Sequence, residues 1–298
     1  MGDEKVNSDY ILNNSNCDLG VVNLHFTNKC NNHCLFCHSG FLDSVERIKL
    51  ESSEWKEIIN LLRPFCSRIN FAGGEPLTEK QLLSDLLEHN NELSLISTMI
   101  TNGDLLDEDW LNEHGHLISA IGISCDSSIE EVQFKLGRGR GNHVENTLKK
   151  FQMISDYNSH SGRILMKLNT VVNRLNYEED MTDFVRETGV SRWKCFQLLE
   201  IVGENSEQYG DLRIDEDEFA QFIRTNDKIS QRGVKAVFED RHELIDTYVM
   251  VNPEGKLFSN RGNVYRKSEP IIEVGVETAL QQIGFNQSNL EGIDRMFL

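Results

Sequence analysis

Apolar and polar positions alternate along the first two thirds of the chain in two rhythms. Residues 21–27 change character at every second position, which is typical of a strand, whereas 51–66 carry apolar residues at helical spacing. The rhythms repeat in turn and predict strands at 21–27, 67–71, 94–100, 119–125, 163–172 and 192–199, with helices at 51–66, 78–93, 107–114, 142–157 and 177–188. Six such units in series predict an α/β fold whose parallel sheet is curled as a partial barrel, with its site at the carboxyl ends of the strands.

The rhythm changes after residue 201. An acidic stretch at 204–218 leads into a predicted helix at 218–228, two strand regions at 234–239 and 246–259, and a closing helix within 272–283. We therefore expect three parts, which are a flexible N-terminal segment at 1–20, a partial barrel at 21–201 and an α+β extension at 202–298.

Composition limits the partners. A chain of 298 residues with 39% hydrophobic content can bury one large core. Its formal charge of −18 argues against nucleic acid or an anionic membrane as partner, because both would repel it. No apolar run approaches the ~20 residues of a membrane span, and the N-terminus has no signal-peptide pattern. We expect a cytoplasmic protein without membrane attachment.

Three cysteines with C-x3-C-x2-C spacing follow the first predicted strand, at Cys30, Cys34 and Cys37. Three thiolates in one tight loop indicate a soft metal. A structural zinc ion needs four ligands, whereas an iron–sulfur cluster held by three cysteines keeps one iron open for chemistry. The alternative is a partial zinc knuckle, but no fourth ligand stands at zinc-ribbon spacing. No cysteine lies beyond Cys195, so the C-terminal third cannot hold a second cluster.

Polar residues two apart on three predicted strands share a face, because side chains alternate along a strand. The pairs are Arg68 with Asn70, Lys167 with Asn169, and Arg192 with Lys194. Four cations facing one interior fit a polyphosphate, with guanidinium forks matching phosphate oxygens. The residues alone leave a second interpretation equally open, in which the cations pair with internal carboxylates such as Glu75 or Asp126, or point outward.

The cysteine motif with an aromatic residue at Phe36, followed by Gly73-Gly74-Glu75-Pro76 after the second strand, resembles the radical S-adenosylmethionine (SAM) superfamily. Longer motifs between about residues 23 and 285, among them Gly137-Arg138-Gly139 and Asp246-Thr247-Tyr248, resemble the viperin family. This resemblance implies a six-unit barrel, a 4Fe–4S cluster and SAM, whose reductive cleavage gives a 5′-deoxyadenosyl radical. It also implies an antiviral lyase that converts a nucleoside triphosphate to its 3′-deoxy-3′,4′-didehydro analogue, a chain terminator.

The resemblance also implies roles for individual residues. Cys30, Cys34 and Cys37 would hold the cluster. Contacts to SAM would come from Phe36, Gly73, Gly74, Glu75, Asn102, Ser124, Arg138 and Asn169. The nucleotide would be bound by Asn23, Arg68, Asn70, Lys167, Arg192 and Lys194. Lys167 and Tyr248 are the catalytic candidates, with Tyr248 assisting departure of the 3′ hydroxyl, and residues 202–298 would complete the nucleotide site. An electron donor of the flavodoxin or ferredoxin type is also implied.

Several positions depart from the family pattern. Arg68 stands where the family has Lys, Ala72 replaces a Ser, residues 38–41 form a shorter segment, and the chain stops without a Trp-containing tail. These departures concern the nucleobase more than the reaction, so CTP is the first expectation, with UTP or GTP as alternatives. Two other hypotheses remain, which are a radical SAM enzyme acting on another phosphorylated metabolite and a non-catalytic protein that binds SAM or nucleotide.

Overall fold

A computed structural model describes residues 17–39 and 50–290 and shows one ten-stranded sheet. The spatial order is β10-β9-β8-β1-β2-β3-β4-β5-β6-β7. Strands β1 to β7 are parallel and neighbour one another in chain order, as the repeated strand–helix pattern predicts. The strands are β1 Gly20–His25, β2 Cys66–Ala72, β3 Ile96–Thr101, β4 Ala120–Ser124, β5 Leu165–Val172, β6 Arg192–Gln197, β7 Lys235–Glu239, β8 Val249–Val251, β9 Lys256–Ser259 and β10 Arg266–Pro270.

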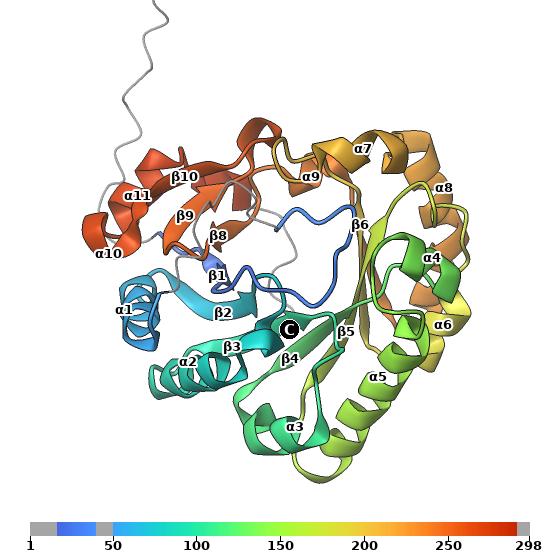
Figure 1. Ribbon diagram of the computed structural model, residues 1–298, viewed down its shortest axis with the longest axis horizontal. Helices are drawn as coiled ribbons and strands as arrows, with labels where there is room; N and C mark the ends of the chain where they lie inside the picture. The colour runs from blue at the N-terminus through green and yellow to red at the C-terminus, as the bar shows by residue number, and fades with distance from the viewer. Residues whose placement is uncertain (1–16, 40–49, 291–298) are drawn as a thin grey trace, which may run out of the picture.

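Helices cover the outside of the curved sheet, while the segment that follows β1 runs across its inside (Figure 1). Helix α1 begins after Glu51, whose N–H donates to the Glu54 carboxylate at 2.8 Å, so a capping box starts this helix. The helices are α1 Ser52–Leu62, α2 Lys80–Glu92, α3 Glu108–His114, α4 Glu130–Lys135, α5 His143–His160, α6 Thr182–Glu187, α7 Ser206–Leu212, α8 Glu216–Asn226, α9 Arg241–Leu244, α10 Ile271–Val274 and α11 Val276–Gln282.

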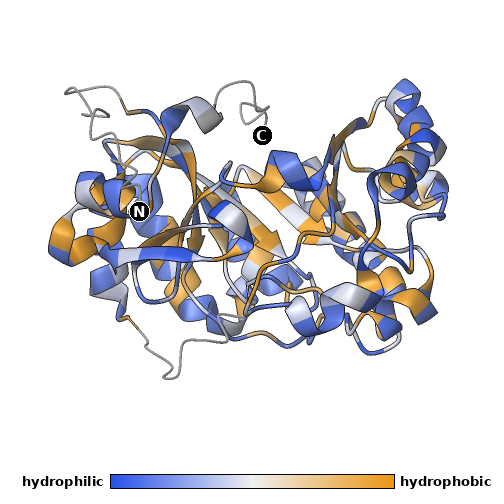
Figure 2. Cartoon of the chain, turned by 90° about the horizontal axis from the view of Figure 1, so that it is seen from above, coloured by the Kyte–Doolittle hydropathy of each residue, from blue (hydrophilic) through white to orange (hydrophobic). Residues whose placement is uncertain are grey.

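The two faces of the parallel strands differ sharply in polarity. The face toward the helices is apolar and fully buried, as at Leu24, Phe71 and Trp193. In Figure 2, apolar colour alternates with polar colour along the strands and helices in this way. The inner face instead carries half-buried polar residues such as Asn70 and Lys167. The strand period therefore builds a hydrophobic layer on one side and a polar interior on the other.

The sheet extends beyond the six predicted strands and remains open. Strand β7 adds a seventh parallel strand beside β6, and β8 pairs in parallel with β1. The expected boundary between residues 201 and 202 thus falls within one continuous sheet. Strand β7 is one edge strand of the sheet. The chain continues from β7 through α9 and residues 245–248 to β8, which lies beside β1. We call this gap between β7 and β8 the seam of the partial barrel.

Several expectations concern the ends of the chain. Most of the segment 1–20 lies outside the described residues, but Leu19 is buried and Gly20 opens β1. Residues 40–41 and the end of the chain also lie outside them. Within residues 17–39 and 50–290, no helix is both long and apolar enough to cross a membrane.

Candidate active site

The three motif cysteines lie on the segment that follows β1, which we call the cluster loop (residues 26–39). Main-chain hydrogen bonds hold it to the loop after α4, since the His33 N–H donates to the Gly137 carbonyl at 3.1 Å and the Leu35 N–H to the Leu136 carbonyl at 2.9 Å. Gly137 has a φ of +77°, and a Cβ there would collide with the His33 carbonyl oxygen. Only glycine lets these two loops approach so closely.

The Gly73-Gly74 turn at the end of β2 packs on the other side of the cluster loop. The Gly74 N–H donates to the Thr27 carbonyl and the Glu75 N–H to the Lys29 carbonyl, both at 2.7 Å. A Cβ on Gly74 would collide with the Lys29 carbonyl oxygen. These two N–H groups therefore hold the cluster loop, because the glycines bring the backbones together. The SAM contacts predicted for Gly73, Gly74 and Glu75 stay predictions.

The Glu75 side chain is 1% exposed and hydrogen-bonded within the protein. Its carboxylate accepts from the Thr101 hydroxyl at 2.6 Å, the Asn102 N–H at 2.7 Å and the Leu77 N–H at 3.1 Å. Burial raises the pKa of Glu75, although these donors oppose the shift. The Asn102 amide in turn donates to the Asn31 side chain at 2.8 Å. Glu75 therefore positions a residue that touches the cluster loop, and its direct contact with SAM stays a prediction.

Asp104 is a second anchor of the cluster loop that the sequence analysis missed. Its carboxylate accepts from the side-chain amides of Asn31 at 3.1 Å, Asn32 at 3.3 Å and Asn146 at 3.0 Å. Burial alone would raise the pKa of Asp104, but hydrogen bonding and charge from His143, with the asparagine amides, lower it. The Asn-Gly-Asp turn after the third predicted strand was the only signal in the sequence.

The donor set of the cluster loop suits an iron–sulfur cluster. Cys30, Cys34 and Cys37 offer three soft thiolates on one loop, and cysteine thiolates are the ligands that hold such clusters. Burial raises the pKa of the Cys34 thiol to about 12. As a cluster ligand, Cys34 would be held as the thiolate.

Arg138 forms a buried ion pair beside the cluster loop. Its Nε lies 2.5 Å from Asp126 Oδ2, and the two residues are 8% and 1% exposed. The guanidinium carbon lies 5.5 Å from the centre of the Phe36 ring. Burial alone would lower the pKa of Arg138, but the Asp126 carboxylate and Cys34 raise it. Arg138 thus has an internal partner, and its predicted contact with SAM stays a prediction.

The structure brings the four predicted cations together on the inner face of the sheet. Lys167 of β5 is the register partner of Arg192 on β6, and Lys194 lies two residues further along β6. Burial, followed by the charges of Lys194 and Arg192, lowers the pKa of Lys167 to about 7. Burial and the charge of Arg192 also lower the pKa of Arg68. We call Arg68, Lys167, Arg192 and Lys194 the cationic cluster.

Lys194 also has an internal carboxylate partner, which the sequence analysis did not identify. Its Nζ lies 2.5 Å from Glu239 Oε1 and donates to the Tyr248 hydroxyl at 2.6 Å. The Tyr248 hydroxyl donates to Glu239 Oε2 at 2.6 Å. The carboxylate interpretation therefore applies to Lys194, although with Glu239 rather than Glu75 or Asp126. Position at the end of a predicted strand was the only sequence signal for Glu239.

Other predicted residues form a polar row on the same inner face. The Asn70 amide donates to Asn23 Oδ1 at 2.6 Å, and the Thr98 hydroxyl donates to Asn70 Oδ1 at 2.8 Å. Asn169 is 8% exposed, and its Oδ1 has no hydrogen-bond partner among the described residues. Ser124 is half-buried and is the register partner of Asn169. A buried unpaired amide oxygen on a polar inner face suits a ligand that donates a hydrogen bond.

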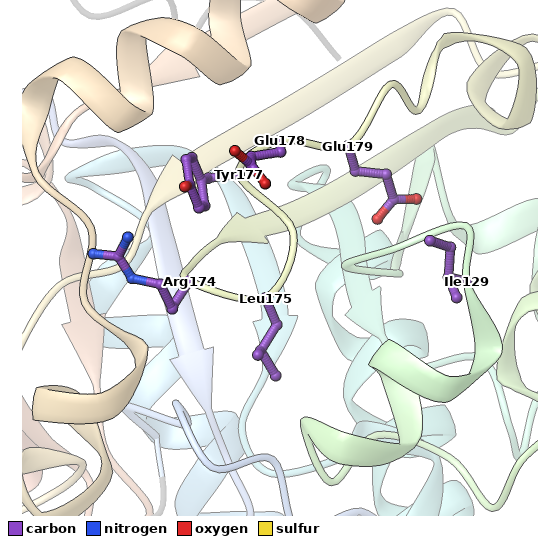
Figure 3. A pocket seen from close by; sticks show the side chains of 6 residues that line it. All are labelled: Ile129, Arg174, Leu175, Tyr177, Glu178 and Glu179. Atoms are coloured by element: carbon purple, nitrogen blue, oxygen red, sulfur yellow. The ribbon is translucent and has the colours of Figure 1, made fainter.

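A hollow on the surface near residues 174–179 is separate from these residues (Figure 3). Charged side chains of this hollow already have partners within the protein. Arg174 pairs with Glu218, and the Glu179 carboxylate accepts from the backbone N–H of Ser128. None of its lining residues was predicted as a site. The lining residues are Ile129, Arg174, Leu175, Tyr177, Glu178 and Glu179.

Comparison with known proteins supports the resemblance to radical SAM enzymes that the sequence motifs indicate. Residues 24–187 match the Radical SAM superfamily. A protein from Flammeovirga pacifica named S-adenosylmethionine-dependent nucleotide dehydratase is 32% identical over 279 residues, covering 92% of this chain and 93% of the relative. A Danio rerio protein, also named as an S-adenosylmethionine-dependent nucleotide dehydratase, is 33% identical and covers 89% of this chain and 74% of the relative.

A solved structure gives independent support for the fold. Tagged anSMEcpe with bound AdoMet superimposes with a TM-score of 0.68 at 14% identity, covering 92% of this chain and 84% of that one. The predicted partial barrel is therefore confirmed. The match to the Radical SAM superfamily confirms the cofactors SAM and a 4Fe–4S cluster. The chain belongs to the radical SAM superfamily and, within it, to the S-adenosylmethionine-dependent nucleotide dehydratases.

Proposed function

We propose that this enzyme is a cytoplasmic dehydratase that converts a nucleoside triphosphate, with CTP as the first candidate and UTP or GTP next, to its 3′-deoxy-3′,4′-didehydro analogue. A product without a 3′ hydroxyl terminates a growing chain, which suits antiviral defence. The observation that carries the proposal is the cationic cluster, which gathers four cations inside a chain of charge −18. Iron–sulfur chemistry and free thiols suit a reducing compartment.

In this proposal the cofactors bind at the carboxyl ends of the parallel strands. Cys30, Cys34 and Cys37 hold the cluster in this proposal. The bound cluster and SAM supply the radical that removes the C4′ hydrogen of the ribose. The residues in contact with SAM are Phe36, Gly73, Gly74, Glu75, Asn102, Ser124, Arg138 and Asn169. Asn169 has the clearest support, because its buried Oδ1 has no hydrogen-bond partner among the residues described. An electron donor of the flavodoxin or ferredoxin type supplies the reducing electrons.

The remaining residues position the nucleotide. Arg68, Lys167, Arg192 and Lys194 bind the triphosphate, while the Asn23 and Asn70 amides bind the nucleoside. Anchoring the phosphates fixes the ribose relative to SAM, and such positioning contributes several kcal/mol to rate, on the order of 7 or more in the best cases. Tyr248 holds a hydroxyl proton that it can give to the departing 3′ hydroxyl. Lys167 of the same inner face is the second candidate to donate a proton in this step.

The test is an anaerobic assay of the reconstituted, dithionite-reduced enzyme with SAM and CTP, UTP, GTP or ATP separately. Mass spectrometry measures 5′-deoxyadenosine and any nucleotide that has lost water. We expect one triphosphate to stimulate 5′-deoxyadenosine formation and to lose water itself. Equal, slow formation of 5′-deoxyadenosine with all four and no nucleotide change would contradict the proposal and favour another phosphorylated substrate.

A further inference from the structure

The contact between Glu239, Lys194 and Tyr248 joins the two sides of the seam. Glu239 ends β7 at one edge of the sheet, and Lys194 lies on the neighbouring strand β6. Tyr248 directly precedes β8, which pairs with β1 on the other side. No strand pairing links β7 to β8 in the described sheet. Side chains therefore connect across the seam where main-chain hydrogen bonds do not.

The hydrogen bonds across the seam have a defined direction. The Lys194 ammonium can only donate, so the Tyr248 hydroxyl accepts from it at 2.6 Å. The same hydroxyl donates its proton to Glu239 Oε2 at 2.6 Å. A carboxylate at 239 thus fixes the place of the Tyr248 hydroxyl.

Glu239 is also a negative charge within a site that has to receive a more negative ligand. It is 7% exposed, and its charge acts on Lys167 against the lowering effect of the neighbouring cations. In the empty site this carboxylate offsets repulsion within the cationic cluster. Once a triphosphate arrives, the same carboxylate repels it and competes for the ammonium of Lys194.

We propose that Glu239 is a positioning residue that orients Tyr248 across the seam and occupies Lys194 until a polyphosphate takes its place. This inference rests on the proposed function. It predicts two opposite effects of one substitution. Removing the charge of Glu239 strengthens binding of the phosphates. An amide at position 239 has one acceptor oxygen where the carboxylate uses one for Lys194 and one for Tyr248, so the same substitution also loosens Tyr248 and weakens the coupling of SAM cleavage to dehydration.

The first experiment measures binding without turnover. Inorganic triphosphate is titrated calorimetrically into the reconstituted enzyme with SAM. Glu239→Gln is expected to bind it about ten-fold more tightly than the unsubstituted enzyme, because a nearby like charge is gone. Glu216→Gln is the matched control, since it removes the same charge from an exposed position on α8. Unchanged or weaker binding by Glu239→Gln overturns the inference, whereas no binding by the unsubstituted enzyme overturns the proposed phosphate site instead.

The second experiment measures the ratio of 5′-deoxyadenosine to dehydrated nucleotide with the accepted triphosphate. For Glu239→Gln we expect a lower KM and a ratio raised about ten-fold. Tyr248→Phe is expected to raise the ratio similarly without tightening triphosphate binding, and the double variant is expected to be no worse than either single one. Additive effects on the ratio would show that Glu239 does not act through Tyr248.

Folding is checked by thermal denaturation of each variant. If Glu239→Gln does not fold, Glu239→Asp tests the same inference, because it keeps the charge but withdraws the carboxylate from Tyr248. We then expect triphosphate affinity within about three-fold of the unsubstituted enzyme and a raised ratio. A normal ratio in Glu239→Asp overturns the positioning role.

Discussion

Arg138 Nε lies 2.5 Å from Asp126 Oδ2, and this ion pair is buried directly against the cluster loop. The second oxygen of Asp126 accepts from the Val171 N–H at 2.9 Å, so one carboxylate joins Arg138 to β5. The arginine in turn packs on Phe36, between Cys34 and Cys37. The pair therefore links the parallel sheet to the segment that carries the motif cysteines.

Removing one partner of this pair should be strongly destabilising. For Asp126→Asn we expect the free energy of unfolding to fall by about 3–5 kcal/mol, because the Arg138 charge is left buried without a counterion. Urea denaturation of the protein measures the change. The double variant Asp126→Asn with Arg138→Gln should recover part of the loss, and a double variant less stable than Asp126→Asn would contradict this account.

Substitution of a motif cysteine should remove iron and SAM cleavage, whereas substitution of a cysteine in the hydrophobic core should not. Cys34→Ala is expected to abolish cluster binding and all SAM cleavage, read as iron content and 5′-deoxyadenosine. Cys195→Ala is the control, since Cys195 is fully buried on the helix side of β6. It should keep its iron and lose about 1 kcal/mol of stability as a small core residue. SAM cleavage retained in Cys34→Ala would rule out its place in the cluster.

Two glycines of the loop after α4 separate two effects of an added Cβ, which are collision with the cluster loop and strain from a positive φ. Gly137 and Gly141 both have positive φ, but only Gly137 lies against the cluster loop. Gly137→Ala should displace His33 and lower the iron content several-fold. Gly141→Ala should cost about 1 kcal/mol of stability and keep its iron, because nothing lies near its Cβ. Equal iron in the two variants would show that the contact at Gly137 is dispensable.

The lowered pKa of Lys167 predicts a pH dependence of triphosphate binding. With a pKa of about 7, this lysine is half protonated at neutral pH in the empty site. A bound triphosphate favours the ammonium, so affinity should fall from pH 6 to pH 9 and binding near pH 7.5 should take up protons. Calorimetry in two buffers of different ionisation enthalpy measures the uptake.

Lys167→Met should flatten this pH profile and weaken triphosphate binding at least about ten-fold, while slow SAM cleavage without nucleotide persists. Lys149→Met, at an exposed position on α5, is the control. Unchanged proton uptake in Lys167→Met would remove Lys167 from the phosphate site.

The lowered pKa of Lys167 also makes the free energy of unfolding depend on pH. The unfolded chain binds more protons between about pH 7 and 10.5, so Lys167 makes the free energy of unfolding rise with pH across that window.

Features with a local period were predictable from the sequence. The alternation along each strand predicted both the apolar outer face and the inward cations, because a strand repeats every two residues. Contacts set by the folded arrangement were not predictable. Glu239 meets Lys194 through strand pairing and Tyr248 across the seam, and Asp104 meets Asn31 from a distant turn. Spacing also did not reveal that the cluster loop takes the N–H donors of Gly74 and Glu75.

The backbone bonds that anchor the cluster loop on both sides have a further consequence. Four main-chain hydrogen bonds anchor this loop, donated by the N–H groups of His33, Leu35, Gly74 and Glu75. In small zinc domains the metal supplies much of the folding free energy, and its removal unfolds the chain. Because these hydrogen bonds do not depend on thiolate ligation, we expect oxidative loss of the cluster to leave this protein folded and able to bind new iron and sulfide.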